Sequence, residues 1–137
     1  MAFREKSAWI SLLATLVVYT VYFYYFGRSL AEGQAFGIGG PIILSIVALV
    51  VIQVVLHIVA AIASPSEARA PEDERDQEIR RRANTGGFIM MQCGMALVAA
   101  SAYFVDKWFM ANLAVGVLAV AQAGFYGAVI FGYRRGV

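Results

Sequence analysis

The chain has 137 residues, of which 61% are hydrophobic and 15% are charged, and its formal net charge at pH 7 is only +2. A water-soluble domain of this length could not bury so much apolar surface, so the composition indicates an integral membrane protein forming a single domain, residues 1–137. The small net charge, with basic residues placed beside acids, argues against nucleic-acid binding. The single cysteine, Cys93, excludes an intramolecular disulfide and a CxxC motif.

Four apolar runs divide the chain, at residues 7–26, 41–63, 87–104 and 108–133. Each is long enough to cross a hydrocarbon core of about 30 Å as a helix. Helices are favoured because lipid offers backbone groups no partner, and the runs lack the alternation of barrel strands. The first run is longer than the apolar region of a signal peptide, so we interpret it as a retained anchor. The predicted fold is an all-α membrane protein, a four-transmembrane-helix bundle made of two hairpins.

Lysine and arginine are distributed unevenly around these runs. Of the 11 basic residues, only Arg28 and Lys107 lie on one predicted side of the membrane, and the others lie on the opposite side. Cytoplasmic flanks collect basic residues. We therefore expect both termini and the segment 64–86 to be cytoplasmic.

The segment 64–86 is the only sizeable region of aqueous composition. A proline followed by three acids at 71–74 is a favourable helix start. Asp76 with Arg80, and Glu78 with Arg82, have the acid-before-base spacing of four residues that supports an exposed helix. We predict a short charged cytoplasmic helix at 72–83, between the second and third runs, which is either separate or continuous with the third run.

A short pattern lies within this segment: Asp73-Glu74-Arg75, then Ile79, then Arg82-Ala83. It resembles the DERxxxIxxKA pattern of the DUF2178 family of small predicted membrane proteins, with Arg82 in the place of the usual lysine. The resemblance covers residues 73–83. It implies a small helical protein of a bacterial or archaeal inner membrane, without an established activity, whose relatives are often encoded beside helix-turn-helix regulators.

The charged segment has two interpretations. It is either a solvated linker that anchors the third run at the lipid headgroups, or a surface that binds a cytoplasmic protein or another subunit of a membrane complex. The candidate partner-binding residues are Asp73, Glu74, Arg75, Ile79, Arg80, Arg81 and Arg82. Exposed carboxylates among arginines stay ionised, and no catalytic motif occurs, so we expect recognition and no enzymatic activity or catalytic residues.

One ionisable residue, His57, lies inside an apolar run, and such residues are default functional candidates. Gln53 is one helical turn away, and Gln92 and Cys93 lie at a similar depth in the third run, so contact among His57, Gln92 and Cys93 is geometrically allowed. The first interpretation is a neutral histidine that hydrogen-bonds between helices, with no cofactor and no metal.

The alternative function is a membrane module that binds a cofactor, a metal or a small solute at His57, Gln53, Gln92 and Cys93. Soft donors that could join a copper or iron site follow in the third run, at Met90, Met91 and Met95. A proton relay through His57 is a further alternative, although no Asp or Glu lies inside any apolar run.

The last apolar run carries small residues at a spacing of four. One row contains Gly116, Gly124, Ala128 and Gly132, and the adjacent row contains Ala119, Ala123 and Gly127. Small residues let helices approach closely, so this face is predicted to be an interface, either with the chain's own helices or with a second copy in a homodimer. Gln122, near the middle of the run, is expected to hydrogen-bond between helices.

Overall fold

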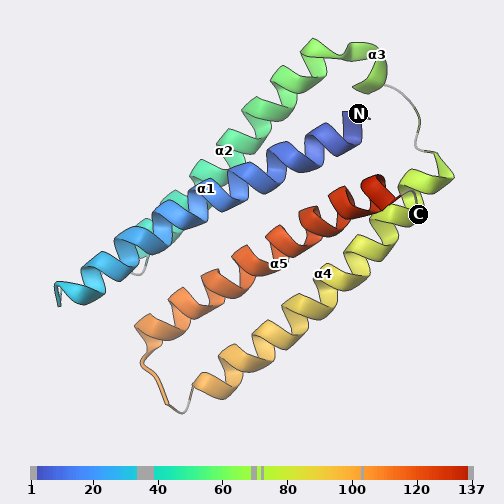
Figure 1. Ribbon diagram of the computed structural model, residues 1–137. Coiled ribbons are helices and arrows are strands. Elements are labelled where there is room, and N and C mark those ends of the chain that lie inside the picture. Colours follow the sequence, from blue (N-terminus) through green and yellow to red (C-terminus); the bar gives the residue numbers. More distant parts are fainter. Residues whose placement is uncertain (1–2, 34–38, 69–70, 72, 103, 136–137) are drawn as a thin grey trace.

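The computed structural model describes residues 3–33, 39–68, 71, 73–102 and 104–135. Its elements are α1 (Phe3–Ala31), α2 (Gly39–Ala63), α3 (Pro65–Ala68), α4 (Glu74–Ser101) and α5 (Lys107–Arg135) (Figure 1). All of these elements except α3 are long and apolar enough to cross a membrane. The predicted all-α class, with four helices of spanning length, is therefore confirmed.

Aspartate side chains mark the starts of α4 and α5. The carboxylate of Asp73 accepts a hydrogen bond of 2.7 Å from the backbone N–H of Glu74 and caps α4, and Asp106 accepts one of 2.7 Å from the N–H of Phe109 in α5. Both bonds satisfy donors that the first turn of a helix leaves without a partner. After α1 the chain turns at Gly33, whose φ of 65° is readily adopted by glycine.

The charged helix predicted at 72–83 is not a separate element. It forms the first turns of α4, which runs without a break from Glu74 to Ser101, while Glu72 lies outside the described residues. The two glycines at 86–87 do not interrupt the helix. With 28 residues, α4 is about 42 Å long at 1.5 Å per residue, which exceeds a hydrocarbon core of about 30 Å. The charged turns and the apolar turns therefore form one rigid rod.

The four long helices lie in a row in the order α2, α1, α5, α4, and neighbours run antiparallel (Figure 1). The substantial helix contacts in the described part of the chain are α1 with α2, α1 with α5, and α4 with α5. Along the helix axes, α3, the start of α4 and both ends of the chain lie together at one end of the bundle (Figure 1). The inner helices α1 and α5 therefore separate α2 from α4.

The hydrophobic core contains a cluster of buried residues that is centred on α1. Its members are Ala14, Val18, Tyr19 and Tyr22 of α1, Leu49 of α2 and Val115 of α5. The Tyr22 hydroxyl donates a hydrogen bond of 2.7 Å to Oδ1 of Asn112, which is only 1% exposed. By contrast, α2 exposes large apolar side chains along its length, with Leu44 at 70% and Ile62 at 74%. An outer surface of this kind suits contact with lipid tails.

The small-residue face of α5 packs against other helices of the chain. A Cβ atom added to Gly116 would lie 3.4 Å from Phe23 of α1, and one added to Gly124 would lie 2.6 Å from the Met90 sulfur of α4. The close approach that the glycine spacing predicts therefore occurs within the chain, which is one of the two alternatives. The expected hydrogen bond of Gln122 is not found, because its buried Oε1 has no partner in the described part of the chain.

Candidate functional site

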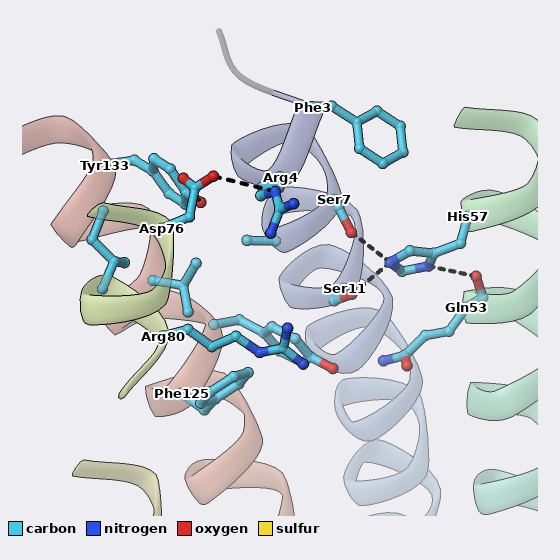
Figure 2. A pocket seen from close by; sticks show the side chains of 14 residues that line it. Phe3, Arg4, Ser7, Ser11, Gln53, His57, Asp76, Arg80, Phe125 and Tyr133 are labelled. Atoms are coloured by element: carbon cyan, nitrogen blue, oxygen red, sulfur yellow. Dashed lines mark hydrogen bonds and ion pairs between the residues drawn. The ribbon is translucent and has the colours of Figure 1, made fainter. Parts of the chain in front are cut away.

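A pocket of about 370 Å³ opens between the four long helices, at the end of the bundle where both termini lie. All four long helices contribute to its lining, including the charged first turns of α4. The polar side chains that line it are Arg4, Ser7, Ser11, Gln53, His57, Asp76, Arg80, Tyr126 and Tyr133 (Figure 2). The pocket therefore joins the two groups of residues singled out in the sequence, the histidine of the second apolar run and the charged segment.

His57 points from α2 toward α1 (Figure 2). Its Nδ1 lies 2.7 Å from the backbone carbonyl oxygen of Gln53. A carbonyl can only accept, so we assign the proton of the neutral ring to Nδ1. The Ser7 hydroxyl, 2.8 Å from Nε2, then donates to the ring, and Ser11 lies 3.4 Å from the same atom. His57 thus links α2 to α1, in agreement with the interpretation of an interhelical hydrogen-bonding histidine.

Asp76 ties the start of α4 to the two inner helices. Its Oδ2 lies 3.3 Å from Arg4 Nε of α1, and its Oδ1 accepts a hydrogen bond of 2.7 Å from the Tyr133 hydroxyl of α5. The Asp76 side chain is only 19% exposed, so these contacts are less screened than a surface pair. A second link joins the same ends of α1 and α5, where Arg134 lies 3.8 Å from Glu5 and stacks over the Trp9 ring.

Glu78 pairs with two arginines on the exposed side of the first turns of α4, away from Asp76. Its carboxylate accepts hydrogen bonds from Arg81 at 2.8 Å and from Arg82 at 2.6 Å. The hydrogen bonds from Arg81 and then Arg82 lower the pKa of Glu78 from 4.5 to about 2, and bonding to Glu78 raises the pKa of Arg81. The predicted pairing of Glu78 with Arg82 is confirmed. The contacts of Asp76 described above, with Arg4 and Tyr133, were not predicted.

The predicted partner-binding residues differ in their burial and in their contacts. Ile79 is only 4% exposed, because it packs against Gly132 of α5, so including it in a docking surface was wrong. Asp73 caps the helix, and Arg75 reaches the Tyr133 carbonyl oxygen at 3.4 Å. Arg80 lines the pocket. The other six predicted residues are all exposed: Asp73, Glu74, Arg75, Arg80, Arg81 and Arg82.

Gln92 and Cys93 do not line the pocket that contains His57 and Gln53. Both are exposed on α4, which is separated from α2 by the inner helices. The contact among His57, Gln92 and Cys93 that their depth allowed is therefore not formed. Depth along a helix does not say which helices are neighbours. In the described part of the chain, no group of three or more His, Cys, Asp and Glu side chains could hold a metal ion.

Two serines of the site were missed in the sequence. Ser7 and Ser11 have the spacing of four residues that places side chains on one face of a helix, and this polar face at the start of the first apolar run was a usable signal. Tyr133 of α5 carried no such signal, because a tyrosine at a helix end is equally typical of a membrane interface. Its role depends on the neighbour that α4 supplies.

The chain matches no family model, no curated protein and no solved structure. The resemblance of residues 73–83 to DUF2178 stays a prediction.

Proposed function

We propose that this is a multi-pass protein of a bacterial or archaeal cytoplasmic membrane, without enzymatic activity, that acts by recognition through the start of α4. In this proposal both termini and the charged turns of α4 face the cytoplasm. The basic residues support this orientation, because all of them except Arg28 and Lys107 lie in the first turn of α1, in the last turn of α5 or between α2 and the apolar part of α4.

One observation carries the proposal: the charged turns of α4 are held rigidly while their outer side is exposed. Asp76 is bound by both α1 and α5, and Ile79 is buried against α5. The side chains of Arg81 and Arg82 are 77% and 63% exposed. A recognition surface fixed in this way avoids most of the entropy cost of ordering on binding. Its partner would be a cytoplasmic protein, or another subunit of a membrane complex, with an acidic surface facing the two arginines.

Site-specific crosslinking in living cells tests this function. A photoreactive phenylalanine analogue would replace Arg82 or, as the matched control, the exposed Lys107 at the other end of the helices. We expect a discrete protein adduct from position 82 that disappears when Arg81→Glu is added, and no adduct from position 107. The absence of an adduct at 82, or equal adducts at both positions, would refute the recognition function.

The pocket favours a second function, the binding of a small solute. Its lining contains His57 and Gln53, which were the candidates for such a site, together with residues from all four long helices. A bundle that served only as an anchor would gain nothing from a polar pocket of about 370 Å³, because polar groups away from water destabilise it unless they are paired.

A further inference from the structure

The charges that line the pocket favour an anionic ligand. The charged residues of the lining are two arginines, Arg4 and Arg80, and one acid, Asp76. Both carboxylate oxygens of Asp76 are already engaged, one by Arg4 and the other by the Tyr133 hydroxyl. The lining therefore carries an excess of one positive charge, and its carboxylate is committed to the protein. Among the described lining residues, a cation would find no carboxylate that is not already bound to an arginine and a tyrosine.

One hydrogen-bond donor in the lining of the pocket, the side-chain nitrogen of Gln53, also lacks an acceptor in the described part of the chain. The side-chain Nε2 of Gln53 is shielded from solvent and has no hydrogen-bond partner among the described residues. An amide nitrogen can only donate, and leaving such a donor buried without an acceptor is costly. Gln53 extends from α2, and Arg80 from α4, toward the middle of the pocket (Figure 2). Nε2 of His57 already interacts with Ser7, so a ligand oxygen is the acceptor that Gln53 lacks.

The lining also contains apolar side chains, among them Phe3, Ala8, Phe125 and Val129. The volume of about 370 Å³ corresponds to roughly a dozen water molecules at about 30 Å³ each, so a phosphate with an ester substituent fits. Guanidinium groups match the geometry of phosphate oxygens. Basic pockets between helices near the membrane surface are typical sites for lipid headgroups.

We propose that the pocket binds an anionic phosphate group through Arg80 and Gln53. The group is supplied either by the headgroup of an anionic phospholipid or by a free phosphate or small phosphate ester. This inference rests on the second proposed function, small-solute binding, and is independent of partner recognition by Arg81 and Arg82.

Thermal unfolding of the protein, purified in a nonionic detergent, tests the inference. The probes are short-chain phosphatidylglycerol and inorganic phosphate, each compared with chloride at equal ionic strength. We expect a saturable rise in the unfolding temperature. Stabilisation by phosphatidylglycerol alone would identify a lipid headgroup, whereas stabilisation by inorganic phosphate would identify a soluble source. The inference is overturned if neither probe stabilises the protein.

Three variants locate the effect. Arg80→Gln removes a charge-assisted donor and should weaken binding about tenfold or more. Gln53→Met keeps the side-chain length but removes the amide, so it should weaken binding and also raise the stability of the unliganded protein. The matched control is Arg82→Gln, which removes the same charge from the same helix outside the pocket and should leave binding unchanged. An equal loss in Arg80→Gln and Arg82→Gln would indicate general surface attraction and overturn the site.

Native mass spectrometry of the protein as extracted from membranes separates this inference from the function on which it rests. A bound species that contains phosphate, and that is lost in Arg80→Gln, supports both. A bound species without phosphate overturns the phosphate assignment and leaves small-solute binding standing.

Discussion

At the residue scale, Gln53 and His57 show how differently two polar side chains one turn apart can be satisfied. His57 bonds to the Gln53 carbonyl oxygen and to Ser7, whereas the side-chain nitrogen of Gln53 has no partner among the residues described. The two residues share a face of α2, as their spacing predicted. The difference depends on α1, whose Ser7 hydroxyl hydrogen-bonds to His57. No described residue of α1 accepts a hydrogen bond from the Gln53 side-chain nitrogen.

Glu78 should titrate far below an ordinary glutamate. Its pKa is lowered to about 2 by hydrogen bonds from Arg81 and Arg82, so the stabilising contact is complete above about pH 4.5 and is lost as the pH falls through about 2. We expect the carbon-13 NMR signal of the Glu78 carboxyl to move with a midpoint near pH 2. The Arg81→Gln/Arg82→Gln double variant should shift this midpoint toward 4.5.

Arg80→Gln is the control for this titration, because Arg80 is not among the groups that shift the Glu78 pKa. High salt should also raise the midpoint, since the group is exposed and screening weakens its ion pairs. An ordinary midpoint in the unaltered protein would show that the two arginines do not hold the carboxylate in solution.

At the element scale, α4 combines two tasks in one helix. Its first turns carry the charges, and its later turns pack closely on α5 through Gly94, which faces Val117. The charge pattern predicted a helix over the charged segment and left its continuity with the next helix open. The structure makes it continuous, so movement of the charged surface must move the α4–α5 contact as well.

Gly94→Ala tests this contact. The added Cβ would overlap a methyl group of Val117 and lie 3.1 Å from Val117 Cβ, an atom that side-chain rotation cannot move away. We expect a loss of stability of about 1–3 kcal/mol, as for other overpacked sites, measured as a lower unfolding temperature in detergent. Gly86→Ala is the control on the same helix, because its added Cβ meets no atom within 4 Å. It should be neutral or stabilising by up to about 1 kcal/mol, and equal behaviour of the two variants would contradict the close α4–α5 packing.

At the scale of the whole molecule, both termini, α3 and the charged turns of α4 lie at the same end of the helix bundle (Figure 1). The proposed orientation places this end in the cytoplasm. The opposite end carries Arg28, which pairs with Glu32 at 2.7 Å, and Lys107. The asymmetry of basic residues between the two ends makes the orientation testable with single cysteines.

Cysteine labelling in whole cells should resolve the orientation. In a Cys93→Ser background, Ser66→Cys should react with a membrane-impermeant maleimide only after permeabilisation, because α3 is predicted to be cytoplasmic. Lys107→Cys should react in intact cells. Both positions are exposed, so burial does not limit either reaction. The reverse pattern would overturn the orientation, and with it the cytoplasmic partner.

The sequence by itself determined the class of the protein, four helices of spanning length and the paired charges of Glu78 and Arg82. These features depend on composition and on spacing within one helix, where hydropathy and the helical repeat act locally. Only the tertiary structure decided that α1 and α5 lie between α2 and α4. That order separates His57 from Gln92 and Cys93, buries Ile79, and brings Asp76 to Arg4 and Tyr133. Neighbour relations between helices depend on how whole surfaces fit together, and no single helix encodes them.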